Sequence, residues 1–227
     1  MSVVDDSTVA YVDDLTARLA SYADAERAVS MRAYMRDQFG FFGIPAPLRR
    51  QITRSVHVDW QYPLLAAELL FQREHRECHY VACDLLATPR TLRSLTITDV
   101  PSIVRLITTK SWWDTVDVLA PTVLGGILRA DRVRLRELAM DWCASDNIWL
   151  QRTAIIIQLK YKADTDADLL FELILQRAAS KEFFVRKGAG WALREYAKVA
   201  PEAVIGFVET HRSRLSPLTV REALKHH

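Results

Sequence analysis

One short stretch in the middle of the chain combines side chains that are seldom found together. In KSWWDTVD, residues 110–117, the indoles of Trp112 and Trp113 are followed by the carboxylates of Asp114 and Asp117. Trp113 and Asp117 are four residues apart, so on a helix they share one face. A carboxylate held beside an aromatic wall can stabilise a positive charge, such as that of a sugar oxocarbenium ion or a cationic base. We therefore expect a site for a developing or resident cation here.

Basic residues recur downstream in similar surroundings. The segments WLQRTA (149–154), FVRKGA (184–189) and LTVREA (218–223) place Arg152, Lys187 and Arg221 at intervals of 35 and 34 residues. A step of 35 residues back from Arg152 reaches Asp117, and one more reaches Ala82. A fixed period of this kind is typical of stacked helix pairs, although HEAT-like repeats usually have a period of about 40–47 residues.

The elements that must position these residues are predicted to be helices throughout. Apolar residues recur at three- and four-residue steps, as in residues 146–162, and no segment alternates as a strand would. Asp146-Asn147 is a candidate N-cap, and prolines fall where helices could begin, at Pro47, Pro63, Pro101, Pro201 and Pro217. We predict an all-α fold, an α-solenoid of HEAT-like helical repeats in which residues 1–227 form a single domain with an acidic, helical N-terminal region at 1–24.

In such a solenoid, equivalent helices lie about 8–10 Å apart and matched positions line up across a concave face. The predicted strip contains Trp113 with Asp117, then Arg152, then Lys187 with Trp191. Arginine and lysine suit phosphates, and indoles suit a base or a sugar. Asp117 and Arg152 could instead form an ion pair between repeats. Other conspicuous residues are expected to be structural: Asp114 as an exposed acid or a first-turn charge favoured by the helix dipole, and the core residues Trp112, Trp142 and Trp149.

Composition excludes some classes of protein. The net charge is only +2, with residues 1–30 at −4 and the two later portions, 31–109 and 110–227, each at +3; a mildly basic body permits nucleic-acid binding without requiring it. No apolar run approaches the ~20 residues of a membrane span, and the acidic N-terminus does not resemble a signal peptide. Cys78, Cys83 and Cys143 lack metal-ligand spacing, so we expect reduced thiols in a cytoplasmic protein without a metal or cofactor.

Several longer segments resemble the AlkD-type DNA alkylation repair glycosylases, from about residue 25 to the end of the chain. They are YMRDQFGFFGIPAPLRRQ (34–51), TKSWWDTVD (109–117), ASDNIWLQR (144–152), QLKYK (158–162), SKEFFVRKGAGWALREYAK (180–198) and SPLTVREALKH (216–226). The resemblance implies a HEAT-like repeat fold with a concave DNA-binding face. It also implies hydrolysis of the N-glycosidic bond of cationic alkylated purines, N3-alkyladenine and N7-alkylguanine, in duplex DNA, which leaves an abasic site without a base-flipping pocket.

Site roles also follow from the resemblance. Asp117 corresponds to the essential aspartate, and Trp113 and Trp191 to its sugar-facing tryptophans. The expected DNA contacts are Arg152, Lys187, Tyr34, Lys160, Arg194, Arg221 and Arg50. Ala46 departs from the threonine of relatives, which puts that contact in doubt. The resemblance further implies a monomer without an obligate protein partner, associated with the nucleoid of a bacterial-type cytoplasm.

Two other functions are compatible with a helical repeat. One is a non-catalytic binder of branched or damaged DNA, and the other is a protein-interaction scaffold. The presence of Asp117 disfavours the first, because such binders lack the acid, and an aromatic and basic strip disfavours the second. An assay for release of a damaged base would distinguish a glycosylase from both of these alternatives.

Overall fold

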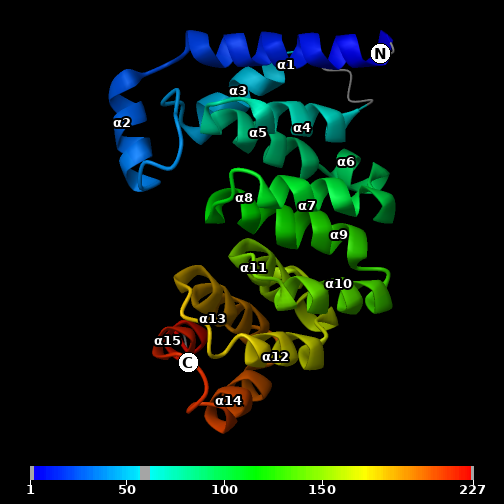
Figure 1. Ribbon diagram of the computed structural model, residues 1–227, viewed down its shortest axis with the longest axis vertical. Coiled ribbons are helices and arrows are strands. Elements are labelled where there is room, and N and C mark those ends of the chain that lie inside the picture. The colour runs from blue at the N-terminus through cyan, green and yellow to red at the C-terminus, as the bar shows by residue number, and fades with distance from the viewer. Residues whose placement is uncertain (1–2, 57–61, 226–227) are drawn as a thin grey trace. The chain divides into compact units, whose positions relative to one another are not determined.

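The computed structural model describes residues 3–56 and 62–225, and these residues form helices joined by short connections (Figure 1). No strand occurs in these two ranges; Gly40 and His75 form an isolated bridge. The α-helices are α1 (Val3–Ser21), α2 (Ala25–Tyr34), α3 (Ala46–Ser55), α4 (Pro63–Gln72), α5 (Arg76–Leu86), α6 (Pro89–Ser94), α7 (Val100–Thr108), α8 (Trp113–Val118), α9 (Gly125–Leu128), α10 (Arg132–Ala144), α11 (Ile148–Ile156), α12 (Ala167–Gln176), α13 (Phe183–Ala197), α14 (Pro201–Thr210) and α15 (Pro217–Ala223). The predicted all-α class is confirmed.

The helices begin where the local chemistry favours a first turn. All five prolines singled out in the sequence lie at the first or second position of a helix, where a missing N–H is harmless: α3, α4, α7, α14 and α15. Asn147 caps α11, its side chain accepting hydrogen bonds from the amides of Trp149 and Leu150 at 2.9 and 3.4 Å. The predicted N-cap is therefore confirmed.

The chain divides into two compact units, Met1–Ser94 and Leu95–His227. In the first unit α4 and α5 pair, and α1 and α3 pack against this pair. Helix α2 has no buried residue of its own. The loop after it is held by Glu77, whose buried carboxylate accepts hydrogen bonds from the amides of Phe42, Gly43 and Ile44 at 2.9–3.1 Å. This carboxylate fixes the loop that joins α2 to α3.

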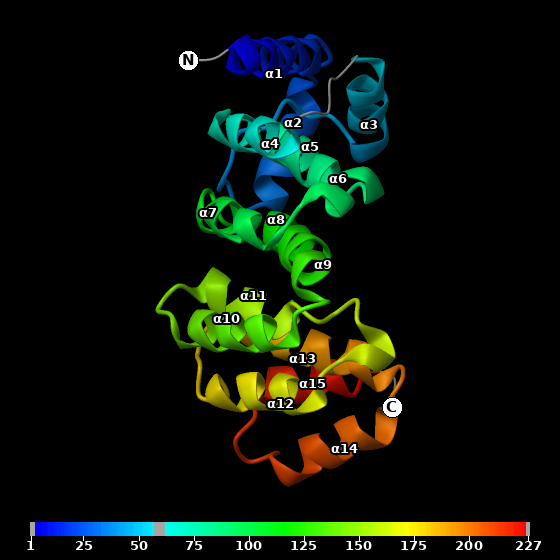
Figure 2. The ribbon, with the colours of Figure 1, turned by 90° about the vertical axis from the view of Figure 1, so that its right-hand side faces the viewer.

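The second unit is built from helix pairs that follow one another in two layers (Figures 1 and 2). Helices α8, α11, α13 and α15 contact in succession in one layer. In the other layer Arg136 of α10 pairs with Glu172 of α12, and Phe171 of α12 stacks on Phe207 of α14 with ring centroids 4.2 Å apart. This is the pairwise stacking of an α-solenoid.

The sequence register is reproduced in this unit. Asp117, Arg152, Lys187 and Arg221 are each the fifth residue of their helix, in α8, α11, α13 and α15. The further step back to Ala82 is out of register, because Ala82 is the seventh residue of α5. The period of about 35 residues therefore describes the second unit and slips before it.

Glycine permits the tight contact between α13 and α15. A Cβ at Gly190 would lie 2.4 Å from Glu222 Cβ and 2.8 Å from the Thr219 carbonyl oxygen. We expect Gly190→Ala to lower the free energy of unfolding by ~1–3 kcal/mol through overpacking. Gly206→Ala is the control, since a Cβ there meets nothing within 4 Å and should stabilise α14 by up to ~1 kcal/mol. Denaturant unfolding measures both, and equal effects of the same sign would contradict the close packing.

Candidate active site

The Asp117 carboxylate lies on α8 just before an irregular turn. Residues Leu119–Leu124 form a π-helical segment between α8 and α9. Pro121 lacks the N–H that would bond the Asp117 carbonyl four residues earlier, which accounts for the irregularity. Single π-turns of this kind often occur at functional sites. The proline thus marks the end of the regular turn that carries the carboxylate.

Asp117 is held by a side-on ion pair with Arg152 of α11. Arg152 Nε donates to Asp117 Oδ1 at 2.7 Å, and Arg152 Nη2 donates to Asp117 Oδ2 at 2.8 Å. Arg152 Nη1 donates to the carbonyl of Phe184 in α13 at 2.5 Å. The Arg152 side chain is 4% exposed and that of Asp117 is 17% exposed. The arginine is buried, whereas the carboxylate keeps some access to solvent.

Effects of opposite sign act on the pKa of the Asp117 carboxyl group. Burial raises the pKa of the Asp117 carboxyl above its ordinary value, the Arg152 guanidinium acts in the opposite direction, and the charge of Asp114 adds to the rise. A carboxylate in a side-on pair still has lone pairs that point away from the arginine. An additional positive charge on that side would stabilise the ionised form.

The two tryptophans of the predicted strip lie on the helices that carry this pair and pack against it, α8 and α13. Trp113 begins α8 and Trp191 lies on α13, and both are partly exposed. The guanidinium carbon of Arg152 lies 5.9 Å from the centroid of the Trp191 ring, within the range of a cation–π contact. The second unit therefore brings Asp117, Arg152 and Trp191 together, with Trp113 one turn before Asp117 on the same helix.

Three further tryptophans, Trp112, Trp142 and Trp149, pack as expected. Trp142 and Trp149 are 7% and 9% exposed. Trp112 is half-buried, with its ring centroid 5.7 Å from that of Trp149 and 5.0 Å from that of Phe184. Phe184, whose carbonyl accepts a hydrogen bond from Arg152, is itself a member of this aromatic cluster. The cluster thereby supports the backbone that fixes the arginine.

Two of the predicted DNA contacts are occupied by a carboxylate of α15. Glu222 accepts from Lys187 Nζ at 2.6 Å through Oε1 and from Arg194 Nη1 at 2.8 Å through Oε2. The Arg194 side chain is 20% exposed and that of Lys187 is 39% exposed. Arg194 is mainly a structural residue in this arrangement, whereas Lys187 can still reach solvent.

The prediction that Arg152 clamps a phosphate does not fit its position. Its guanidinium is buried and engaged by Asp117 and by the Phe184 carbonyl, so it has no exposed face for a backbone phosphate. The alternative, an ion pair between repeats, is what the structure contains. In this structure Arg152 therefore holds the Asp117 carboxylate in place.

The remaining predicted contacts are exposed. Lys160 follows α11, and Arg221 lies on α15. Tyr34 and Arg50 belong to the first unit: Tyr34 ends α2 and is 73% exposed, and the Arg50 side chain is 56% exposed, with Nε 3.4 Å from Asp84 Oδ2. Exposed side chains that could donate hydrogen bonds to a phosphate thus occur in both units.

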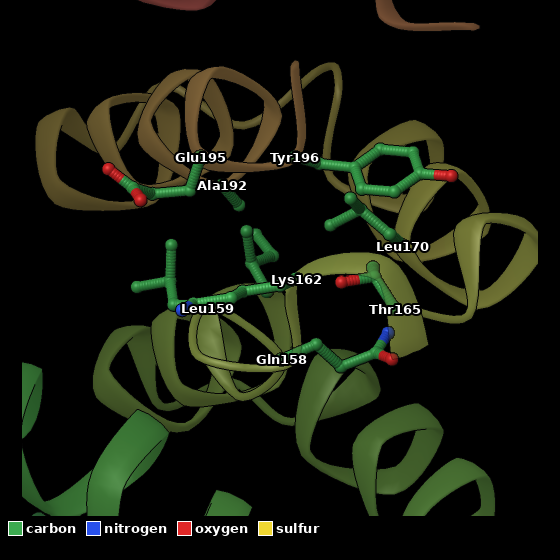
Figure 3. A pocket seen from close by; sticks show the side chains of 9 residues that line it. Gln158, Leu159, Lys162, Thr165, Leu170, Ala192, Glu195 and Tyr196 are labelled. Carbon is green, nitrogen blue, oxygen red and sulfur yellow. The ribbon is translucent and has the colours of Figure 1, made fainter. Parts of the chain in front are cut away.

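A small pocket elsewhere in the second unit is separate from these residues. It lies between the end of α11, α12 and α13 and is lined by Ile155, Gln158, Leu159, Lys162, Thr165, Leu170, Ala192, Glu195 and Tyr196 (Figure 3). None of the predicted site residues lines it. Gln158 spans part of its wall by bonding the backbone N–H and carbonyl of Asp166 at 2.8 and 3.1 Å. We assign this pocket to packing.

Sequence reasoning missed two contributors to the site. The Phe184 carbonyl could not be identified, because a backbone acceptor has no signature of its own. Glu222 could have been found: it follows Lys187 by 35 residues, the same interval that separates Asp117 from Arg152. An acid one repeat away from a base was the available signal.

Among the described residues, no cluster of His, Cys, Asp and Glu side chains has the arrangement of a metal site. Within the same ranges, no helix has both the length and the apolar character needed to cross a bilayer.

Comparison with known proteins agrees with this geometry. A sequence model of the family described as DNA alkylation repair enzyme matches residues 15–227. The chain belongs to this family. This chain is similar to a solved structure described as a predicted DNA alkylation repair enzyme from Enterococcus faecalis, with a TM-score of 0.80 and 30% sequence identity. The match covers 90% of this chain and 96% of that one. A search of curated proteins gave no significant match. Family membership supports a role in DNA repair and confirms the predicted resemblance.

Proposed function

We propose that this DNA alkylation repair enzyme is a glycosylase for cationic alkylated purines in duplex DNA, chiefly N3-alkyladenine and N7-alkylguanine. The observation that carries the proposal is the Asp117 carboxylate, which is fixed by Arg152 and partly open to solvent, with Trp113 one turn earlier on α8 and Trp191 in contact with Arg152. This combination suits a positive charge that develops on a deoxyribose. The product would be an abasic site.

The proposed mechanism follows from the charge of the lesion. An alkylated purine of this kind is already cationic, so the glycosidic electrons can leave with the base as a neutral molecule, and no general acid is required. Asp117 would stabilise the positive charge on the sugar and accept a proton from the water that attacks C1′. Trp113 and Trp191 would hold the sugar by their ring faces, at ~0.5–2 kcal/mol for each such contact.

This mechanism does not need a pocket for a flipped base, the usual device of glycosylases. The lability of the lesion supplies the selectivity, so the base can stay in the duplex. Lys187, Lys160, Arg221, Arg50 and Tyr34 would contact the DNA backbone. Binding would then weaken with added salt, because each neutralised phosphate releases counterions. We propose a monomer that acts on the DNA of a bacterial-type cytoplasm.

Release of the damaged base tests the proposal. We expect the protein to release 7-methylguanine from a duplex faster than spontaneous depurination and to release no uracil from a matched duplex. Uracil is neutral and would have to leave as an anion, which the site does not assist. Cleavage of abasic product in alkali measures both. A protein that binds both duplexes and releases neither base would be a non-catalytic binder, and efficient release of uracil would contradict the lability mechanism.

A further inference from the structure

Three charged side chains meet where α15 packs on α13. One oxygen of Glu222 accepts from Lys187 and the other from Arg194, at 2.6 and 2.8 Å. The Glu222 side chain is only 10% exposed. The group of two cations and one anion carries a net charge of +1, so the carboxylate halves the charge that α13 presents at this point.

The side chains of this group differ in how firmly they are held. Glu222 is fixed, because its helix is packed against Gly190 and the Thr219 hydroxyl donates to the Arg186 carbonyl at 3.1 Å. Arg194 also reaches the Glu222 carbonyl at 3.3 Å. Lys187 is joined to the group by its ion pair with Glu222 alone, and 39% of its side chain is exposed. The ammonium of Lys187 is therefore the member that can change partner.

This group borders the candidate active site. Lys187 precedes Trp191 by four residues, so the two share a face of α13. Trp191 in turn contacts Arg152, the partner of Asp117. A DNA backbone that brings a sugar to Asp117 would carry its phosphates along this face. Proximity to the Lys187 ammonium also lowers the pKa of the Glu222 carboxyl, so it is ionised at neutral pH.

We propose that Glu222 is an internal counter-ion that limits the DNA affinity of this site. A backbone phosphate displaces the carboxylate from Lys187, while Arg194 keeps Glu222 in place. The ligand chemistry is that of a phosphodiester, and this inference rests on the proposed function for its partner, duplex DNA. Because the phosphate replaces an internal anion, Lys187 contributes less to affinity than an unpaired lysine would.

Neutralising the carboxylate should therefore strengthen binding. We expect Glu222→Gln to tighten binding to an undamaged duplex about fivefold, the scale of one unit charge a few ångströms away in water. The slope of log K against log salt should steepen, by at most the ~0.9 that one additional net positive charge at the phosphates contributes. Fluorescence anisotropy over a salt series, with an undamaged duplex as the probe, measures both quantities.

Glu195→Gln is the matched control, because Glu195 also lies on α13 and pairs with a lysine, Lys198, at 2.6 Å. It should leave affinity within twofold of the wild type. In a Lys187→Met background, Glu222→Gln should also change affinity by less than twofold, since the lysine it would release is gone. If Glu222→Gln melts below the assay temperature, Glu222→Asp replaces it. This side chain keeps its charge for Arg194 but is too short for Lys187, so a smaller tightening in the same direction is expected.

The outcomes separate this inference from the proposed function. A folded Glu222→Gln variant with wild-type affinity and slope, or with weaker binding, would overturn the counter-ion role even if 7-methylguanine is released. Tightening that persists without Lys187 would overturn it as well. If the wild type binds duplex DNA and Glu222→Gln tightens that binding but neither protein releases 7-methylguanine, the counter-ion role stands and the glycosylase proposal fails.

Discussion

Replacing Asp117 with asparagine is expected to lower the rate of 7-methylguanine release by about 10²–10³-fold, the effect of removing one preorganised electrostatic partner. The amide has nearly the same shape but no charge with which to stabilise a cationic sugar. Binding to duplex DNA should be equal to that of the wild type or tighter, because a carboxylate near the phosphates has been removed. Single-turnover release and anisotropy measure the two quantities separately.

Asp114→Asn is the matched control for this change. Asp114 is also an acid of α8, but its side chain accepts a hydrogen bond from the amide of Thr115 in the first helical turn, at 3.0 Å. Its replacement should leave release within a few-fold of the wild type. Thermal unfolding of both variants shows whether each is folded at the assay temperature. Wild-type release by a folded Asp117→Asn variant would remove this carboxylate from the mechanism.

The sequence was sufficient for the parts of the structure that depend on local chemistry. The proline at the start of α15 and the Asn147 cap were predictable, because a first helical turn has the same requirements in any fold. The register in the second unit was predictable because each of its helix pairs repeats the same packing. The 35-residue register fails at Ala82, because the fifth residues of α5 and α8 are 37 residues apart instead of 35.

The candidate site was predicted less completely, for a physical reason. Residue type indicates which side chains can bind a phosphate, but burial decides which of them are free to do so. Arg152 and Arg221 occupy the same position in their helices, yet the first is buried against Asp117 and the second is exposed. Glu222 was overlooked although it follows Lys187 by the same 35 residues that separate Asp117 from Arg152, and the structure adds that it also pairs with Arg194.

Replacing Arg152 with alanine tests this distinction, and we expect a loss of stability together with a loss of activity. The change leaves the Asp117 carboxylate largely buried without its partner. Removing one member of a buried pair commonly costs ~3–5 kcal/mol, and the 17% exposure of Asp117 places the expected loss at the lower end of that range. Release of 7-methylguanine should fall as well, because the carboxylate is no longer oriented. Denaturant unfolding and single-turnover release measure the two effects.

The salt dependence of DNA binding separates orientation from phosphate clamping. Because the Arg152 guanidinium is buried, Arg152→Ala should leave the slope of log K against log salt unchanged. Arg221→Ala removes an exposed cation from the equivalent position and should flatten that slope by about one while unfolding stability is retained. Arg152→Lys keeps the charge without the two-pronged pairing, so it should remain folded and lose part of the activity. If instead Arg152→Ala flattens the slope and leaves stability intact, the guanidinium meets DNA directly, and Asp117 must be oriented by something other than this pair.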